Sequence, residues 1–404
     1  MKYFFELGNN PSLSSAEIAA IFGMDKQYQL IGGKILIADL PSMLDAKSII
    51  KKIGGTIKIG VLFEIKIKNT DLESILPFLE DSIINKTEKI CFGISYYGRK
   101  KFNSKYLGMD IKSLLKERGN NCRWVCGKEN ILSSVIVEQN KLINKGFELI
   151  IIEVEDGFLF GKTLAVQPFK ELSARDYGRP ARDDHSGMLP PKLAQIMINI
   201  ASKGINNSLE IKLLDPFCGS GTIITEAMIM GYKNILGSDL SARAVTDTKN
   251  NISWILRRFS NLNDLIKNEP DIRQIDSKKI AASFQRESIS LIVTEPYLGP
   301  QRGLGDIFAV KKELENLYQE SLKQLNQILK TNGRVVIIFP IFNQKQKMHF
   351  VNIDLSGFKI VNPLPCMLQK EKTLKLSFRQ TIVYGREGQR VWREIVTLEK
   401  CQPY

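Results

Sequence analysis

Two short stretches of the chain combine acids, glycines and an aromatic residue in an order that suits binding of a cofactor beside a substrate. The first, DPFCGSGT, spans residues 215–222 and follows the apolar run IKLL. The second, TEPYLGP, spans residues 294–300 and follows the apolar run ISLIV. Polar turns directly after buried strands are where open α/β enzymes bind their ligands. Both stretches therefore predict chemistry at the carboxyl edge of a parallel sheet.

The first stretch has the residue types needed to hold a cationic cofactor. Gly219 and Gly221 would let the backbone approach a ligand closely, and a helix starting near Thr222 would offer free backbone N–H groups. Asp215 at the strand end suits an amino-bearing cofactor better than a pyrophosphate. Asp239 ends the next strand-like run, about 20 residues later, as the ribose-binding acid does in nucleotide-binding folds. S-Adenosylmethionine, with its ammonium and sulfonium groups, matches this pattern.

Two later strand-like runs complete the predicted site. The run near DIRQI ends at Asp276, which we place at the adenine of the cofactor, with Asp271 as the competing acid. The run SISLIV leads into the TEPYLGP turn. Strands one and four of such a sheet flank the point where the strand order reverses, so the two turns should face the same crevice.

The chain divides by pattern into an N-terminal α+β region and a C-terminal α/β domain. Residues 1–65 and 66–165 each read as a small α+β unit, and SSAEIAAIFG predicts a helix capped by Ser14 or Ser15. Residues 166–185 are rich in Pro, Arg and Asp and predict a linker. In residues 186–404, strand-like runs alternate with longer helices, which is typical of a parallel sheet with helical crossovers.

Composition and charge narrow the class of protein. The 404 residues are 43% hydrophobic and 25% charged, as in globular proteins of the cytoplasm, and the net charge of +14 favours a polyanionic partner such as nucleic acid. A generally lysine-rich proteome is the alternative explanation. Six scattered cysteines and two histidines give no zinc-ligand set and argue against a metal site. The apolar runs are too short to span a membrane, so we expect no membrane association.

Basic residues gather between positions 96 and 128, with aromatic residues among them. We interpret this segment as an RNA-contacting face, because cations bind phosphates and aromatic rings stack on bases. The alternative is a solvated helix face beside ordinary core aromatics. The bases are Arg99, Lys100, Lys101, Lys105, Lys112, Lys116, Arg118, Arg123 and Lys128, and the aromatics are Tyr96, Tyr97, Phe102 and Trp124. Arg302, in the glycine-rich QRGLGD, is a further candidate phosphate contact.

Several stretches resemble a known enzyme family. DPFCGSGTI followed by an acid-ended second strand resembles the class I S-adenosylmethionine-dependent methyltransferases. RDYGRPARDDHSGMLPPKLAQIMINIA resembles the segment before the cofactor motif in the THUMP-domain tRNA guanosine-10 N2-methyltransferases of archaea and eukaryotes. The opening YFFELGNNPSLSSAEIAAIFG and the late REGQRVWREI are also similar to that family. The resemblance spans nearly the whole chain.

The resemblance implies an architecture and a set of partners. It implies an N-terminal ferredoxin-like domain, a THUMP RNA-binding domain and a Rossmann-like methyltransferase domain with a mostly parallel seven-stranded sheet. It implies S-adenosylmethionine as cofactor and tRNA as partner, and it admits a small activating protein subunit. Carried over by motif, the cofactor-binding residues are Asp215, Phe217, Cys218, Gly219, Ser220, Gly221 and Thr222 around the methionine part, Asp239 at the ribose, Asp276 at the adenine, and residues 187–191, Pro190 among them, as a brace.

The TEPYLGP turn departs from the family pattern. Relatives that methylate exocyclic amino groups carry Asp or Asn, two prolines and an aromatic residue here, and the oxygens of this turn accept the hydrogens of the amine. Thr294, Glu295, Pro296 and Tyr297 occupy those positions in this chain. Either Thr294 and the carbonyl of Glu295 accept the hydrogens, or the turn is shifted and Glu295 supplies the carboxylate, which we favour.

The altered turn leaves three functions open. The chain is an N2-guanosine methyltransferase of tRNA, an enzyme acting on another amino group such as adenine in ribosomal RNA or DNA, or a non-catalytic RNA-binding protein that has kept the fold. We favour the first, because the resemblance spans nearly the whole chain and the first half carries a basic segment. We rank the non-catalytic protein last, because the cofactor motif is intact from residue 215 to residue 222.

Overall fold

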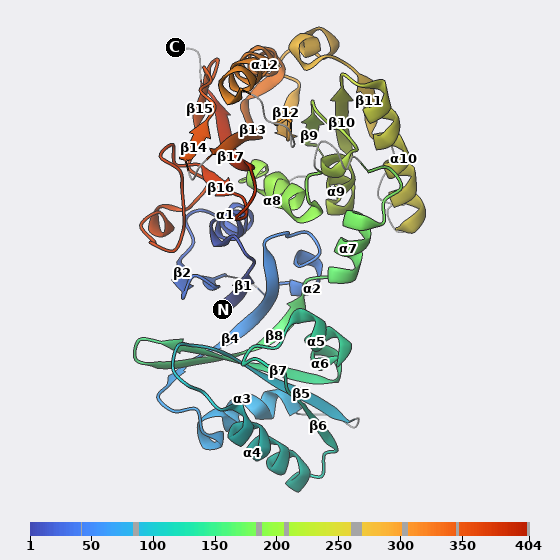
Figure 1. The fold of residues 1–404 in the computed structure, drawn as a ribbon. Coiled ribbons are helices and arrows are strands. Elements are labelled where there is room, and N and C mark those ends of the chain that lie inside the picture. The colour runs from blue at the N-terminus through green and yellow to red at the C-terminus, as the bar shows by residue number, and fades with distance from the viewer. Residues whose placement is uncertain are drawn as a thin grey trace. The chain divides into compact units, whose positions relative to one another are not determined.

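The computed structural model describes residues 1–41, 43–83, 89–182, 188–205, 210–259, 269–300, 306–344 and 347–401. These residues form two compact units (Figure 1). Unit 1 comprises residues 1–11, 25–51 and 56–169, and unit 2 comprises residues 12–24, 52–55 and 170–404. The N-terminal helix α1 (Pro11–Phe22) therefore belongs almost entirely to unit 2. Helix α7 (Phe169–Tyr177) lies in the segment that was expected to be a linker.

Unit 1 is built on one eight-stranded sheet with the order β2-β3-β1-β4-β8-β7-β5-β6. Most neighbours are antiparallel, whereas β5 runs parallel to both β6 and β7. A single sheet thus joins the strands of residues 1–65 to those of residues 66–165, and the division of this region into two domains stays a prediction. The strands are β1 (Lys2–Leu7), β2 (Tyr28–Ile31), β3 (Ile35–Asp39), β4 (Thr56–Ile67), β5 (Ile90–Tyr97), β6 (Cys122–Val125), β7 (Gly146–Val154) and β8 (Gly157–Val166).

Helices in unit 1 form because apolar residues recur on one face. Helix α4 (Ser104–Glu117) buries Leu107, Ile111 and Leu115, spaced one turn apart, and the side chain of Asn103 caps its first turn. That face packs into a core with residues of helix α3 (Leu72–Ile83) and strands β5 and β7. The remaining helices of unit 1 are short: α2 (Ala46–Ile49), α5 (Ser134–Gln139) and α6 (Leu142–Lys145).

A buried charged network ties the strands of unit 1 together. Lys58 on β4 is fully buried, and its Nζ donates to Glu148 Oε1 on β7 at 2.7 Å and to the Leu132 carbonyl at 2.6 Å. The same ammonium lies 3.6 Å from Glu6 Oε2 on β1. Glu148 also accepts from the hydroxyls of Ser95 and Thr163. A charge removed from water must be paired, so each member of this network depends on the others.

Unit 2 is built on a nine-stranded mixed sheet whose main path is β11-β10-β9-β12-β13-β17-β15. β9 to β13 run parallel, whereas β14 to β17 join antiparallel. Along the seven-stranded main path only β17 runs against the others, because β15 is antiparallel to β17 and therefore points the same way as β13. The expected mostly parallel seven-stranded sheet corresponds to this path, and β14 and β16 pair antiparallel beside it, so the described sheet has nine strands. The strands are β9 (Lys212–Asp215), β10 (Asn234–Asp239), β11 (Asp271–Gln274), β12 (Ile289–Thr294), β13 (Leu329–Gln344), β14 (Lys347–Phe350), β15 (Phe358–Ile360), β16 (Ile382–Tyr384) and β17 (Val391–Lys400).

The strand order reverses between β9 and β12. From β9 the chain proceeds to β10 and β11 on one side, and β12 and β13 lie on the other side. Asp215 ends β9 and Thr294 ends β12, so the two polar turns leave the sheet from adjacent strands, as the sequence predicts. Besides α1 and α7, the described helices of this unit are α8 (Pro191–Ala201), α9 (Thr222–Met230), α10 (Ala242–Arg258) and α12 (Ile307–Ile328), with 3-10 turns η1 (Ser277–Ser283) and η2 (Cys366–Leu368).

Helix α1 is held to unit 2 by a buried carboxylate. It begins at Pro11, so Ser14 and Ser15 lie inside it and do not cap it, contrary to the sequence prediction. Glu17 Oε1 accepts from the Gly54 N–H at 2.9 Å and from Asn199 Nδ2 on α8 at 2.8 Å. Burial raises the pKa of Glu17 to about 7, although these hydrogen bonds oppose the shift.

Candidate active site

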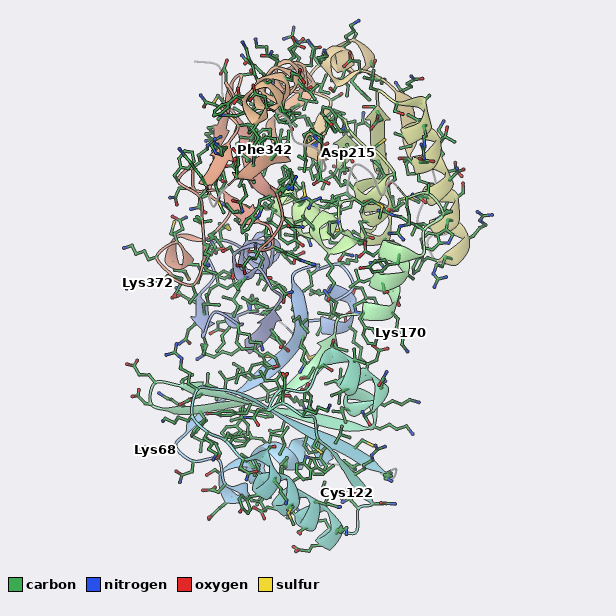
Figure 2. The ribbon with its side chains drawn as sticks, in the orientation of Figure 1. Lys68, Cys122, Lys170, Asp215, Phe342 and Lys372 are labelled. Carbon is green, nitrogen blue, oxygen red and sulfur yellow. The ribbon has the colours of Figure 1, made fainter. Side chains whose placement is uncertain are left out.

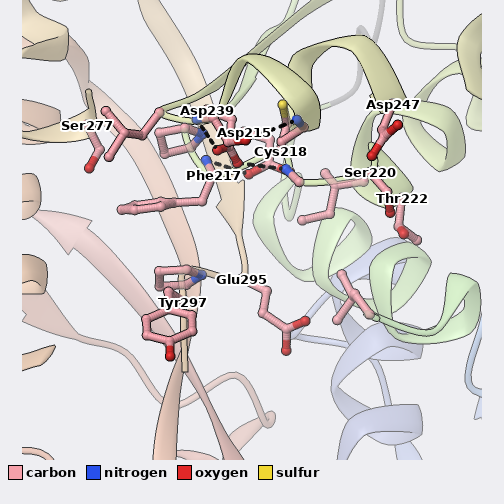
Figure 3. Close-up of a pocket in the computed structure, with 18 of the residues that line it drawn as sticks. Asp215, Phe217, Cys218, Ser220, Thr222, Asp239, Asp247, Ser277, Glu295 and Tyr297 are labelled. Atoms are coloured by element: carbon pink, nitrogen blue, oxygen red, sulfur yellow. Dashed lines mark hydrogen bonds between the residues drawn. The ribbon is translucent and has the colours of Figure 1, made fainter. Parts of the chain in front are cut away.

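A cavity of about 820 Å³ opens at the carboxyl edge of β9, β10 and β12 (Figure 3). It lies in unit 2, in which Asp215 is labelled in Figure 2. The size suits a nucleotide-sized ligand with part of a substrate. Of the residues predicted to bind cofactor or substrate, Asp215, Phe217, Cys218, Gly219, Ser220, Thr222, Asp239, Asp276, Glu295, Pro296 and Tyr297 line the cavity.

The turn between β9 and α9, residues 216–221, is called the glycine turn here, and its two glycines have different roles. Both have positive φ, 52° at Gly219 and 81° at Gly221. A Cβ on Gly219 would meet nothing within 4 Å, whereas a Cβ on Gly221 would lie 2.8 Å from Thr248 Cγ2. Gly219 therefore leaves room on the cavity side, and Gly221, which does not line the cavity, is needed for close packing against α10.

Helix α10 clamps the glycine turn from behind. Thr248 Oγ1 donates to the Gly219 carbonyl at 2.8 Å, and Asn251 Nδ2 donates to the Ser220 carbonyl at 2.7 Å. Asn251 also exchanges two hydrogen bonds with the backbone of Ala181, at 2.9 and 3.0 Å. Sequence reasoning missed both side chains. Their signal was two polar residues three apart on the otherwise apolar face of an amphipathic helix.

Asp215 is a buried acid at the floor of the cavity. Burial raises its pKa to about 7, hydrogen bonds from Thr294 and from the Phe217 N–H oppose the shift, and the charges of Asp239 and Glu295 add to it. A positive group bound beside it would stabilise the ionised form and lower that pKa. The structure thus fits a cationic ligand such as the ammonium of S-adenosylmethionine.

Two further acids follow the neighbouring strands. Asp239 accepts from the Gly219 N–H at 3.0 Å and from the Ser241 N–H at 2.9 Å, which fixes its carboxylate at the cavity wall. Asp276 caps η1 by accepting from the Lys278 N–H at 3.0 Å. Both line the cavity, in the order in which the chain predicted them for ribose and adenine. Their roles stay predictions.

The TEPYLGP turn, residues 294–300, is called the acceptor turn here, and only some of its residues face the cavity. Thr294 is fully buried and its hydroxyl donates to Asp215 Oδ1 at 2.7 Å. It does not line the cavity, so the expected accepting role of its hydroxyl is not supported by the geometry. Glu295, Pro296 and Tyr297 do line it, and the Tyr297 ring is 52% exposed. The Tyr318 hydroxyl on α12 fixes the turn by donating to the Tyr297 carbonyl at 2.5 Å.

Glu295 is paired with an arginine that the sequence did not suggest. Arg393 Nε donates to Glu295 Oε1 at 2.5 Å, and its Nη2 lies 3.5 Å from Oε2. Burial tends to lower the pKa of Arg393, but the Glu295 carboxylate outweighs this and raises it. The carboxylate that follows β12 and the guanidinium on β17 therefore stabilise each other.

The segment before α8 contributes two of the residues expected to brace the cofactor. Met188 and Leu189 line the cavity, whereas Pro190 is the N-cap residue of α8 and does not line it. Arg179 Nη1 donates to Thr222 Oγ1 at 2.5 Å, at the first turn of α9. The bracing role of residues 187–191 stays a prediction.

The predicted RNA-binding segment lies in unit 1. All nine of its basic residues are exposed, around α4 and β6. Tyr96 and Tyr97 are buried on β5, so the interpretation of these two rings as base-stacking residues is wrong. Phe102 and Trp124 are partly buried against the same core, and a stacking role for them stays a prediction. Arg302 falls outside the described residues.

Among the described residues, no three or more His, Cys, Asp or Glu side chains are grouped so that they could hold a metal ion. None of the described helices combines the length and the apolar character that a membrane span requires.

Comparisons with known proteins agree with this geometry. Residues 179–350 match the family described as RMKL-like, methyltransferase domain. The tRNA (guanine(10)-N2)-dimethyltransferase of Methanocaldococcus jannaschii is 24% identical over 347 residues, which cover 82% of this chain and 89% of that protein. The protein of the same name from Methanothermobacter thermautotrophicus is 27% identical over 52% of this chain, and the match spans 57% of its own length.

A solved structure supports the fold along the full chain. The crystal structure of TrmN from Thermus thermophilus covers 99% of this chain and 100% of its own, with a TM-score of 0.51 and 16% identity. The resemblance predicted from the sequence is confirmed: the chain carries an S-adenosylmethionine-dependent methyltransferase domain and is similar along most of its length to the tRNA guanine-N2 methyltransferases.

Proposed function

We propose that the protein methylates the exocyclic N2 amino group of a guanosine in tRNA, at position 10, with S-adenosylmethionine as methyl donor. The observation that carries the proposal is a single cavity with two kinds of lining residue. The acids Asp215 and Asp239 line its cofactor side, and the acceptor turn lines it with Glu295, Pro296 and Tyr297. The relatives named above act on guanine N2 of tRNA, and they supply the choice of substrate.

The positions of the groups that line the cavity support the cofactor-binding roles proposed for them. Asp215 faces the ammonium of the methionine part, Asp239 the ribose hydroxyls, and Asp276 the adenine edge. Gly219 gives the cofactor a close approach to the backbone, because its Cβ direction is open. The bound donor supplies an electrophilic methyl on a sulfonium, which becomes a neutral thioether when the methyl moves to the amine nitrogen.

The acceptor turn orients the exocyclic amine of the base, which is a weak nucleophile. The lone pair of an aromatic amine is delocalised into the ring, so catalysis depends on holding the nitrogen in line with the methyl group. Tyr297 stacks on the base, since its ring is exposed beside the cavity. Glu295 accepts a hydrogen of the amine and takes the proton that the nitrogen must lose after methylation. Pro296 keeps this turn rigid.

Unit 1 is proposed to bind the tRNA. We define its basic surface as Arg99, Lys100, Lys101, Lys105 and Arg123, all of which are exposed. The loop carrying the first of these is anchored by Glu153, which accepts from the N–H groups of Arg99 and Lys100 at 2.7 and 3.1 Å. With Tyr96 and Tyr97 in the core, this surface offers chiefly cations for phosphates, and the exposed Tyr106 follows Lys105 on α4. Sequence-independent backbone binding is therefore its expected mode. The THUMP assignment and a small activating subunit belong to the same proposal.

A nucleoside analysis tests the proposed function. The pure protein is incubated with labelled S-adenosylmethionine and tRNA transcripts, and the product is digested and its methylated nucleosides are identified. N2-methyl- or N2,N2-dimethylguanosine is the expected product. Label on a ribose, on a ring carbon, or in adenosine of ribosomal RNA or DNA with none in tRNA would refute it. RNA binding without turnover would indicate a non-catalytic protein.

A further inference from the structure

The ion pair at the acceptor turn holds a carboxylate in a fixed plane. Glu295 is 11% exposed and Arg393 is 15% exposed, so both charges are largely removed from water. Arg393 contacts both carboxylate oxygens through Nε and Nη2. The planar guanidinium fork orients a carboxylate better than a lysine would. An ionised carboxylate offers about four lone-pair sites, so the arginine leaves acceptor capacity for a ligand.

The sheet register fixes where this carboxylate lies. Thr294 pairs with Ile337 on β13, and Arg393 pairs with Pro340 further along the same strand. Glu295 and Arg393 therefore meet beyond the carboxyl edge of β12, where the substrate base must enter. Figure 3 shows Glu295 and Tyr297 extending from this turn, with Asp215 and Asp239 grouped at the cofactor turn.

We propose that Glu295 selects guanine by accepting hydrogen bonds from two adjacent N–H groups on the edge of the base, and that Arg393 is the positioning residue that orients it. This inference rests on the proposed function and specifies how the same site recognises its substrate. Guanine presents N1–H and N2–H side by side. Adenine presents N6–H beside the bare acceptor N1, and cytosine presents N4–H beside the bare acceptor N3.

A carboxylate can only accept hydrogen bonds, so it pairs with the guanine edge and repels the other two. An amide, as in the Asn of related turns, carries one donor and one acceptor and does not discriminate in this way. The carboxylate at position 295, together with its largely buried arginine, therefore makes this turn a reader of guanine. A bidentate contact of this kind discriminates by about 10- to 100-fold.

The test uses the base analogue 2-aminopurine, which keeps the exocyclic amine but has a bare acceptor at N1. The guanosine methylated by the wild-type enzyme is mapped first, and a tRNA with 2-aminopurine at that position is prepared. We expect wild-type kcat/KM on guanosine to exceed that on 2-aminopurine by about 10- to 100-fold. In Glu295→Gln, the amide can accept from the amine and donate to N1, so the ratio should fall towards unity.

Arg393 is tested by the same ratio, because a merely structural role would not change it. Arg393→Ala should lower the guanosine to 2-aminopurine ratio, and Arg393→Lys should restore part of it by keeping the charge. The control is Glu287→Gln, which breaks the 3.0 Å ion pair of Glu287 with Lys400 outside the cavity and should leave the ratio unchanged. Cofactor affinity measured by calorimetry confirms that each variant is folded.

Two outcomes would contradict the inference, and they are distinguishable. If the enzyme methylates guanosine but the ratio is the same in wild type and Glu295→Gln, the reader role is refuted and the proposed function stands. If the methyl group is found on adenosine, the proposed function fails and the reader role fails with it.

Discussion

Cofactor affinity should depend on pH through Asp215. Its pKa is raised to about 7 in the ligand-free protein, chiefly by burial, and the ionised form is the one that binds an ammonium group. If only that form binds, the apparent dissociation constant at about pH 6 should be about 10-fold above its value at about pH 8. Isothermal titration of S-adenosylmethionine across this range measures the effect.

The Asp215→Asn variant distinguishes the contribution of the charge of Asp215 to cofactor affinity from the contribution of its shape. It keeps an oxygen that can accept from Thr294, but it cannot complement a cation, so affinity at about pH 8 should fall about 10- to 100-fold. Its affinity should also lose the dependence on pH. An exposed acid outside the cavity provides the control, and Asp354→Asn should behave as the wild type. A wild-type profile that is flat from about pH 6 to about pH 8 would refute the reasoning.

The same variant should stabilise the ligand-free protein. The folded pKa of Asp215 lies above its ordinary value of 3.8, so the native state binds more protons and stability falls as pH rises from about 4 to about 7. The shift corresponds to at most about 4 kcal/mol of unfolding free energy above that range. Removing the charge should therefore raise the melting temperature at about pH 8 while it abolishes tight cofactor binding, a trade expected of a functional site.

Four other perturbations follow from the contacts described above. Gly221→Ala should lower stability by about 1–3 kcal/mol through its positive φ and the clash with α10, whereas Gly219→Ala should mainly weaken cofactor binding, as thermal melts and titrations would show. Lys58→Ala should cost about 3–5 kcal/mol in urea unfolding, because it leaves buried carboxylates unpaired. Thr294→Asp should weaken cofactor binding by placing a second acid against Asp215, and Thr294→Ser should not. Neutralising the basic surface should flatten the salt dependence of tRNA binding; an unchanged slope would make it an ordinary solvated face.

The parts of the site that the sequence predicts correctly are local in the chain. Asp215 with its glycine turn lies within a single strand–turn–helix unit, Asp239 ends β10, and Asp276 follows the end of β11 by two residues, so period and turn chemistry are sufficient to locate them. The parts that it misses join distant segments. Arg393 is 98 residues from Glu295, and Asn251 is 70 residues from Ala181. Such pairs depend on strand register and helix packing, which no local pattern specifies.

The aromatic residues of unit 1 were misassigned for a different reason. Tyr96 and Tyr97 end a strand in which every residue but one is buried, so the alternation that would mark one ring as exposed does not exist. Phe102 stacks on Tyr96 with ring centroids 4.5 Å apart and is partly buried against the same core. Composition alone cannot separate a stacking ring from a core ring, because both are equally apolar.

The threonine and the glutamate of the acceptor turn are coupled by electrostatics. The hydroxyl at position 294 lies 2.7 Å from Asp215, an acid that burial and two neighbouring carboxylates already make hard to ionise. An aspartate at 294, as in the related turns, would add a third carboxylate at hydrogen-bond distance and raise that pKa further. Moving the acid to 295 places it against Arg393, which compensates its charge. The neutral hydroxyl at 294 stabilises the ionised Asp215, so the altered turn keeps an acid for the substrate while this hydrogen bond opposes part of the rise in the pKa of Asp215.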